Sequence, residues 1–286
     1  MLFPTFSRRR FLTYSAILPW ALDVLAASAI PVGLELFSVR EELKRDPQGT
    51  VRAVAGMGYR GVEFYAPYFE WSESQTKEMR KLLDDLGIRC FSTHNDSSFF
   101  TAQNLSKARD SNAILGSKYV VMASAKPEPG MDGWMSVVDT LNFAAEQLKP
   151  AGLKAGYHNH QLEFTPAADL PNKARPIAII AKHTNPTVML QLDVGTCLEA
   201  GSDPTAWIRA NPGRIRSLHC KDWSPDPAKG YAVLFGEGAA DWKSIFAAAE
   251  SVGGVEYYLV EQEGSRYSEL DTARKCLVEF RTLHSS

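Results

Sequence analysis

The sequence repeats one pattern eight times: a short run of β-branched and aromatic residues, followed by a longer stretch with helical spacing. The predicted strands are Val32–Phe37, Gly61–Tyr65, Ile88–His94, Tyr119–Ala123, Lys154–His160, Val188–Gly195, Ile215–Asp222 and Tyr257–Glu263. Strict alternation of strand and helix over about 250 residues is typical of a single (β/α)8 TIM barrel. A doubly wound open sheet is the alternative, because it uses the same alternation.

Signals for helix ends support the helical stretches. The segment Ser72–Gln75 precedes the helix predicted for Thr76–Leu86 and has the composition of an N-terminal cap. An aspartate likewise stands before each of the helices predicted for Ala206–Ala210 and Trp242–Val252. These caps place helices between the predicted strands, as the alternation requires.

Two observations favour the closed barrel over the open sheet. No Gly-x-Gly-x-x-Gly sequence follows the first predicted strand, so the dinucleotide site common in open sheets is missing. Polar residues also recur at alternate positions near the carboxyl ends of the strands, and alternate positions point to one side. They are Glu63 and Tyr65; Ser92 and His94; His158 and His160; Gln191 and Asp193; Ser217, His219 and Lys221; Glu261 and Glu263. Only a barrel directs all these side chains toward one axis.

The N-terminal segment predicts an export signal. Ser7–Leu12 contains consecutive arginines before Phe-Leu and is followed by a mostly apolar stretch up to Ala29, which is similar to a twin-arginine signal. We therefore expect residues 1–29 to be a signal peptide, residues 30–286 to be the barrel, and the mature protein to be periplasmic. The apolar stretch contains Pro19 and Asp23 and is shorter than the roughly 20 residues of a spanning helix, so we expect no stable membrane span.

Composition narrows the class of partner. The chain has 31 Lys+Arg against 33 Asp+Glu, and no long basic run lies outside the N-terminal segment. Binding to nucleic acid depends on clustered basic residues, so we expect no nucleic-acid partner. The 4 cysteines are widely spaced without a Cys-x-x-Cys pair, and we expect them to be buried apolar residues rather than disulfides. The oligomeric state cannot be read from the sequence.

The polar residues at the strand ends would form one cluster of ionisable groups. Its members are His158, His160, Asp193, His219, Glu261 and Glu263, with Glu63, His94 and Lys221 nearby. Burying so many carboxylates and imidazoles is unfavourable unless something neutralises them. A divalent cation would do so, and a mixture of imidazoles and carboxylates suits Mn, Co, Zn or Fe better than Mg.

Seven segments carry motifs in chain order. They are Gly33–Arg40, Gly61–Phe64, Tyr157–Phe164, Leu192–Gly195, Leu218–Asp222, Gly236–Trp242 and Val260–Glu263. Together they resemble the xylose-isomerase-like sugar isomerase/epimerase superfamily, over nearly the whole mature chain. The resemblance implies one divalent metal ion, held by a residue of the fifth strand together with Asp193, His219 and Glu261.

The sequence departs from this family at two positions. Many members have Glu as the ligand on the fifth strand, whereas this chain has His158 there and Glu163 five residues later. We rank His158 first, because it lies on a strand and Glu163 is expected in the following loop. Glu35 stands where close relatives often have Gln, and we expect it to form a salt bridge, with Arg40 as the candidate partner.

The resemblance also implies a reaction. A bound metal polarises a sugar carbonyl and its neighbouring hydroxyl, lowers the pKa of the adjacent C–H and stabilises an enediolate. Glu261 and a second group, Glu163 or His160, would remove and return the proton. The predicted substrate contacts are Glu63, His94, Lys221 and Glu263. We therefore expect a metal-dependent isomerase or epimerase acting on a small sugar or keto-sugar.

Three alternatives use the same fold. If a β-substituent leaves instead, the enzyme is a lyase or hydrolase of keto-glycosides such as 3-keto-sugars. A sugar-binding barrel without turnover would also keep the pattern of polar residues. An apurinic-site endonuclease would need a basic face and more zinc ligands, which disfavours it for a mature chain expected to be acidic.

Overall fold

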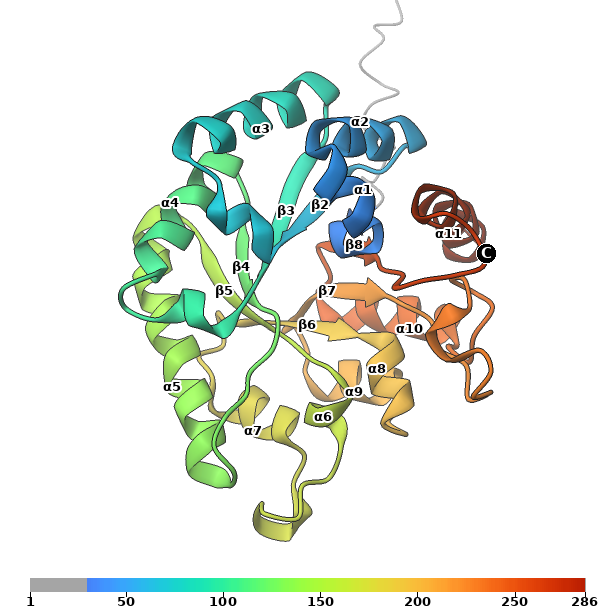
Figure 1. The fold of residues 1–286 in the computed structure, drawn as a ribbon. Coiled ribbons are helices and arrows are strands. Elements are labelled where there is room, and N and C mark those ends of the chain that lie inside the picture. The colour runs from blue at the N-terminus through green and yellow to red at the C-terminus, as the bar shows by residue number, and fades with distance from the viewer. Residues whose placement is uncertain (1–29, 286) are drawn as a thin grey trace, which may run out of the picture.

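The computed structural model describes residues 30–285 of the chain, and its eight parallel strands pair in chain order until β8 meets β1 (Figure 1). The strands are β1 Val32–Glu35, β2 Gly61–Tyr65, β3 Arg89–Asn95, β4 Tyr119–Met122, β5 Lys154–His158, β6 Met189–Asp193, β7 Ile215–Cys220 and β8 Tyr257–Val260. The predicted TIM barrel is confirmed, and the open sheet was the wrong alternative. The predicted signal peptide, residues 1–29, lies outside the described residues, so it and the periplasmic location stay predictions.

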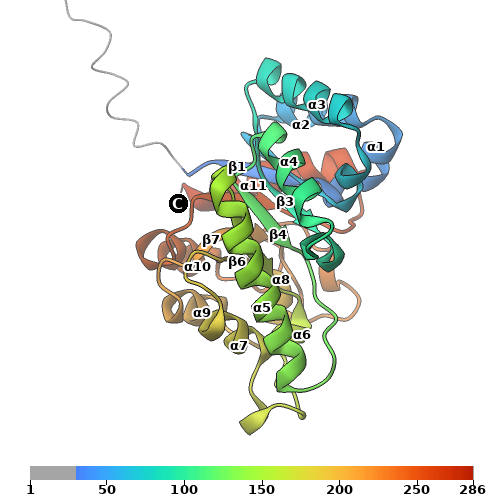
Figure 2. The same ribbon diagram turned by 90° about the vertical axis from the view of Figure 1, so that its left-hand side faces the viewer.

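At least one helix follows each strand. The helices are α1 Arg40–Arg45, α2 Pro47–Met57, α3 Glu73–Leu86, α4 Leu105–Leu115, α5 Met131–Leu148, α6 Gln161–Phe164, α7 Pro176–His183, α8 Val194–Glu199, α9 Pro204–Ala210, α10 Trp242–Ala248 and α11 Glu269–His284. They lie outside the ring of strands in Figure 1, and Figure 2 shows α5 running along the outside of the barrel. Ser72 and Gln75 form a reciprocal capping box at the start of α3, as their sequence signal indicates.

Five strands, β1, β5, β6, β7 and β8, end two or three residues before their predicted carboxyl ends. At β1 and β6 the reason is a helical turn that the last strand residue caps. The side chain of Glu35 accepts a hydrogen bond from the backbone N–H of Phe37, and that of Asp193 accepts one from Thr196. Because these strands end early, several expected site residues lie in the segments after the strands rather than on them. They are His160, Lys221, Glu261 and Glu263.

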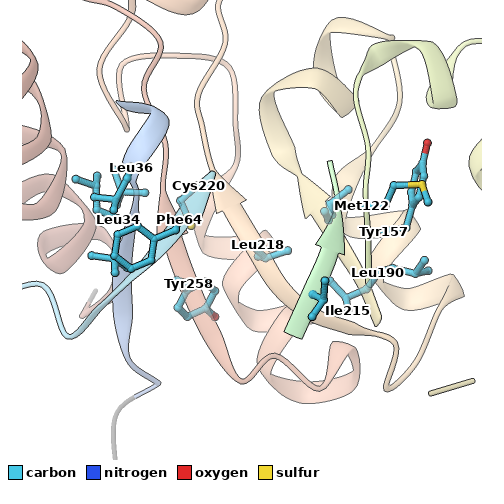
Figure 3. Close-up of a cluster of buried hydrophobic side chains, with 14 of the residues drawn as sticks. Leu34, Leu36, Phe64, Met122, Tyr157, Leu190, Ile215, Leu218, Cys220 and Tyr258 are labelled. Carbon is cyan, nitrogen blue, oxygen red and sulfur yellow. The ribbon is translucent and has the colours of Figure 1, made fainter. Parts of the chain in front are cut away.

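Apolar side chains pack on both sides of the barrel wall. A large outer layer fills the space between strands and helices, and Figure 3 shows part of it, including Leu34, Phe64 and Leu218. Inside the barrel, a separate apolar cluster is made of Phe91, Tyr119, Val121, Met189, Tyr257 and Leu259. A Cβ atom on Gly61 would approach the Phe91 ring to 2.5 Å, so the glycine is needed to leave room for that ring.

The four cysteines are free thiols and buried, as predicted. Within residues 30–285, none of the helices has both the length and the apolar character needed to cross a membrane.

Candidate metal centre

Five ionisable residues of the predicted cluster meet at the carboxyl end of the barrel. Glu63 lies on β2, His158 ends β5, Asp193 ends β6, His219 lies on β7, and Glu261 directly follows β8. All five side chains are buried.

The alternation of side chains along each strand explains why these groups point toward the barrel axis. Leu218 and Cys220, the neighbours of His219, both pack in the outer apolar layer. Val62 and Phe64 do the same on either side of Glu63. A register shift between Val62 and Glu63 interrupts the regular pairing of β2 with β3 at this point. Such irregularities are common in strands next to active sites.

His219 lies between two carboxylates. Its Nδ1 is 2.6 Å from Oε2 of Glu261, and its Nε2 is 2.8 Å from Oε1 of Glu63. Burial alone would lower the pKa of His219, but the two carboxylates outweigh it and raise this pKa well above the ordinary value. Burial alone would raise the pKa of Glu63, and His219 outweighs it and lowers that pKa. These two carboxylates therefore favour the protonated form of His219 in the metal-free protein.

Asp193 has one satisfied and one unsatisfied oxygen. Oδ1 accepts a hydrogen bond of 2.9 Å from the backbone N–H of Thr196, which caps α8. Oδ2 is buried and has no hydrogen-bond partner among the described residues. Burial, and then the negative charge of Glu261, raise the pKa of Asp193. A buried carboxylate oxygen without a hydrogen-bond donor is unfavourable, and its nearest cation is the Lys221 ammonium at 3.7 Å, so this atom is open to a metal ion.

His158 supplies a neutral imidazole beside that oxygen. Its Nε2 lies 3.9 Å from Oδ2 of Asp193, and its Nδ1 is 3.2 Å from Oε1 of Gln191. Burial, followed by the neighbouring imidazoles, lowers the pKa of His158 well below its ordinary value. Ligand atoms of His158, Asp193 and His219 all lie within 4.8 Å of one another. Two imidazoles and carboxylate oxygens at this spacing suit a transition-metal ion.

The structure does not bring Glu163 to this centre. Its Oε1 accepts a hydrogen bond of 2.7 Å from the Tyr157 hydroxyl, and its Oε2 accepts one of 2.9 Å from the backbone N–H of His160. Glu163 is the third residue of α6 and forms part of a capping box at its start. Because both oxygens already hold donors, this arrangement does not favour Glu163 as an acid, base or alternative metal ligand, and that role stays a prediction.

Lys221 neutralises several of the remaining carboxylates. Its ammonium hydrogen-bonds Glu263 and lies 3.7 Å from both Oδ2 of Asp193 and Oε1 of Glu261. These carboxylates, led by Glu261, outweigh burial and raise the pKa of Lys221 above its ordinary value. Lys221 and His219 in turn outweigh burial and hold the pKa of Glu261 below the ordinary value. Lys221 is therefore bound to the chain's own acids, whereas the sequence predicted a substrate contact.

A cavity of about 240 Å³ opens beside the centre, and its wall includes four of the predicted site residues. They are His94, His160, Glu261 and Glu263. The aromatic rings of Phe37 and Tyr65 also line it, and they meet edge to face with centroids 5.4 Å apart. This combination of acids, imidazoles and aromatic rings fits a small polar ligand with an apolar face.

A second group, formed by Glu35, Glu63 and His94, lies next to the first. Oε1 of Glu35 is buried without a hydrogen-bond partner among the described residues and is 3.8 Å from Nδ1 of His94. Burial, and then the charges of Glu261 and Glu63, raise the pKa of Glu35. Burial lowers the pKa of His94 to about 4.

The expected salt bridge from Glu35 to Arg40 is not formed. The Arg40 guanidinium instead donates to the backbone oxygens of Phe37 at 3.1 Å and Glu263 at 3.3 Å. Glu35 faces the axis because it is opposite Glu63 in the register of β1 and β2. The same alternation that selected Glu63 could have selected it as a site residue.

Two supporting residues were not predicted as part of the site. Gln191 donates from Nε2 to Oε2 of Glu63 at 2.9 Å. The Asn159 side chain accepts from the backbone N–H of Asp193 at 3.1 Å and donates to Thr196 at 3.0 Å. Gln191 shares the axis-facing parity of Asp193 in the sequence, and Asn159 directly follows His158, but only the paired strands reveal their contacts.

Comparisons with known proteins agree with the fold. A family model described as "Xylose isomerase-like TIM barrel" matches residues 51–279. A solved sugar phosphate isomerase/epimerase from Parabacteroides distasonis ATCC 8503 has a TM-score of 0.75 and 27% sequence identity, over 90% of this chain and 96% of that chain. The IOLI protein, solved with a binding zinc atom, has a TM-score of 0.67 over 87% of this chain and 97% of that chain. At 18% identity this second likeness shows the fold alone.

Among curated proteins, an inosose dehydratase from Geobacillus thermodenitrificans (strain NG80-2) is 23% identical over 193 residues. The match covers 60% of this chain and 62% of that relative, so the chain spans less than two thirds of the relative's length.

Proposed function

The chain belongs to the xylose isomerase-like TIM barrel family, and from this premise we propose that it is a metal-dependent sugar isomerase or epimerase. The proposed reaction moves a proton at a carbon next to a carbonyl group. One observation carries the proposal: His158, Asp193, His219 and Glu261 converge at the barrel mouth, and Oδ2 of Asp193 has no hydrogen-bond partner among the described residues. The resemblance of the whole barrel to a sugar phosphate isomerase/epimerase supports the same reaction class.

We propose that these four residues hold one divalent ion, with Mn, Co, Zn or Fe preferred over Mg. Nε2 of His219 contacts Glu63, so Nδ1, which faces Glu261, is the nitrogen we assign to the metal. A carboxylate behind a ligating imidazole fixes its tautomer and orientation. When bound there, the ion would polarise a sugar carbonyl and lower the pKa of the adjacent C–H.

The chain's own residues would then move the proton. Glu261 and His160 line the same cavity, which makes them the pair that can remove a proton and return it to the substrate. Return to the neighbouring carbon gives isomerisation, and return to the opposite face gives epimerisation. Glu263 and His94 are placed to hold hydroxyl groups of the sugar.

A second candidate is elimination, and the similarity to inosose dehydratase favours it. The first step would be the same: a base takes the proton next to the carbonyl. The electron pair then forms a double bond, the β-substituent leaves, and a protonated group of the site supplies a proton to it. With a 3-keto-glycoside, the leaving group would be the aglycone.

The test combines metal analysis with hydrogen exchange. We would load the purified protein with metal and incubate it in D₂O with D-fructose, D-xylose and a 3-keto-glucoside, following carbon-bound deuterium by NMR. Exchange together with an isomerised or epimerised sugar supports the leading proposal, and aglycone release supports the second. Asp193→Asn should lose both metal and exchange, while His284→Ala, a histidine on α11 at the C-terminus, should keep both. Unchanged metal content in Asp193→Asn would contradict both proposed reactions.

A further inference from the structure

The charge of the cavity at the barrel mouth restricts which sugars it can hold. Three carboxylates line it, from Asp96, Glu261 and Glu263, together with the imidazoles of His94 and His160. None of the described residues that line it is a lysine or an arginine. Glu261 and Glu263 are compensated by His219 and Lys221, whereas Asp96 has no such ion pair among the described residues. A phosphate group brought into this cavity would find no lysine or arginine in its wall and would approach the Asp96 carboxylate, which is unfavourable at short range.

Two cations beside this cavity, Lys221 and Arg40, are already bonded to acceptors of the chain, while Lys126 is exposed and acts electrostatically on Asp96. Lys221 hydrogen-bonds Glu263 and has two further carboxylates at 3.7 Å. Arg40 donates to two backbone oxygens and stacks over the Phe37 ring, with its guanidinium carbon 4.7 Å from the ring centroid. A phosphate would have to displace these contacts to gain Lys221 or Arg40 as a partner.

Arg266, in the loop after β8, is also paired. Its guanidinium donates to both oxygens of Glu237, over 2.9 and 2.6 Å. Arginine and carboxylate in this two-bond arrangement satisfy each other's hydrogen-bonding geometry. This cation is therefore not presented to the barrel mouth as a phosphate ligand.

The loop after β7 is where TIM barrels often bind phosphate through backbone N–H groups. In this chain those donors are used by Asp222, which is 1% exposed. Its carboxylate accepts from the backbone N–H groups of Gly236, Gly238 and Ala240 at 3.0, 3.1 and 3.3 Å. The indole N–H of Trp242 donates to it at 3.0 Å.

The loop is built around this internal carboxylate. A Cβ atom on Gly238 would lie 2.0 Å from Oδ1 of Asp222, so the glycine lets the backbone close on the side chain. An internal anion thus fills the backbone donors that would otherwise be available to a phosphate group.

We infer that the substrate is an uncharged sugar or keto-sugar without a phosphate group, although the similar solved structure is described as a sugar phosphate isomerase/epimerase. Carboxylates and imidazoles around the cavity accept hydrogen bonds from hydroxyls, and the Phe37–Tyr65 pair offers an apolar surface to the C–H face of a sugar. That this ligand is a substrate rests on the proposed function, whereas the preference for an uncharged ligand rests on the cavity and on the loop around Asp222.

The test compares each sugar with its own phosphate. Binding to the metal-loaded protein would be measured by calorimetry for D-fructose against D-fructose 6-phosphate and for L-ribulose against L-ribulose 5-phosphate. Inorganic phosphate would be titrated into the metal-free protein, which removes direct binding to the ion. We expect each neutral sugar to bind at least about tenfold more tightly than its phosphate, with no saturable binding of inorganic phosphate. Tighter binding of either sugar phosphate overturns the inference.

A charge variant checks the cause. Asp96 lines the cavity and caps the turn at Ser98, a cap that Asn can keep. Asp96→Asn should raise the affinity for a sugar phosphate relative to its neutral partner by about two- to fivefold. Asp85→Asn changes the net charge equally on the exposed surface of α3, where Asp85 pairs with Lys81, and should leave that ratio unchanged. If Asp96→Asn leaves the ratio of the two affinities, sugar phosphate to neutral sugar, at its wild-type value, the electrostatic argument is contradicted.

The two proposals can fail separately. If no sugar exchanges a carbon-bound hydrogen in D₂O but the neutral sugars still bind more tightly, the proposed reaction fails and the charge preference stands. If exchange occurs and is faster with the sugar phosphates, the reaction stands and the charge preference fails.

Discussion

Oε1 of Glu63 lies 2.8 Å from Nε2 of His219, although the two residues are 156 positions apart in the chain. Glu63 is itself held on its other oxygen by Gln191, at 2.9 Å, and by the Ser92 hydroxyl. The carboxylate is thus fixed on both sides, and it orients the imidazole so that Nδ1 faces Glu261 and the centre. Glu63 therefore positions a proposed metal ligand. It is not among the described residues that line the cavity.

Glu63→Gln should weaken metal binding by about 10- to 100-fold, because the amide no longer fixes the tautomer that leaves Nδ1 free. The metal bound at equilibrium with a chelator of known affinity would measure this. Glu263→Gln is the matched control, because it removes an equal charge from the same end of the barrel and Glu263 contacts Lys221 rather than His219. It should change the metal affinity far less than Glu63→Gln does. Equal losses in the two variants would show that net charge, and not the Glu63–His219 contact, controls binding.

Metal binding should release a proton and strengthen as the pH rises. Glu261 and Glu63 outweigh burial and raise the pKa of His219, which favours the protonated imidazole in the metal-free protein. The pairing of protonated His219 stabilises the metal-free fold fully below the ordinary histidine pKa, and this contribution is lost as the pH rises through the raised pKa. A metal must displace that proton, so the apparent affinity should rise by up to about tenfold per pH unit below the raised pKa.

Calorimetry in two buffers with different ionisation enthalpies measures the released protons directly. Binding without proton release at neutral pH would mean that the metal does not take a nitrogen of His219.

Much of the fold and centre follows from one regularity, the alternation of side chains along the strands. Because the carboxyl ends of parallel barrel strands meet at one mouth, the parity of His158, Asp193 and His219 was enough to predict that their ligand atoms converge. The register between Asp193 and His219 on the adjacent strands β6 and β7 agrees with that prediction.

The loops beyond the strands could not be predicted in the same way. Glu163 belongs to a helix of four residues, too short to show any helical period, and only its spacing from His160 carries the signal of a capping box. The partners of Lys221 depend on how the loop after β8 returns to β7, which brings Glu263 onto its ammonium group. Contacts between two loops leave no periodic trace in a sequence.

Glu163→Gln should destabilise the protein rather than abolish its chemistry. The amide would keep an acceptor for Tyr157 but turn its N–H toward the backbone N–H of His160, leaving buried donors unpaired. We expect a loss of about 1–3 kcal/mol in the free energy of unfolding, measured by denaturant titration. Metal content should stay at the wild-type level, and kcat/KM should remain within about tenfold. A loss of kcat beyond about a hundredfold in a well-folded variant would return Glu163 to the acid–base role.

Asp222→Ala should be among the most destabilising single changes in the loop after β7. The substitution leaves the backbone N–H groups of Gly236, Gly238 and Ala240 and the indole N–H of Trp242 without their acceptor. Each buried donor left unpaired costs about 1–3 kcal/mol, and partial access to water as the loop opens reduces the sum, so we expect a loss of about 3–5 kcal/mol. Asp226→Ala, in the exposed part of the same loop, removes only a local contact with Ala228 and a surface pair with Lys229. That control should cost less than about 1 kcal/mol, and similar losses in both variants would contradict the role assigned to Asp222.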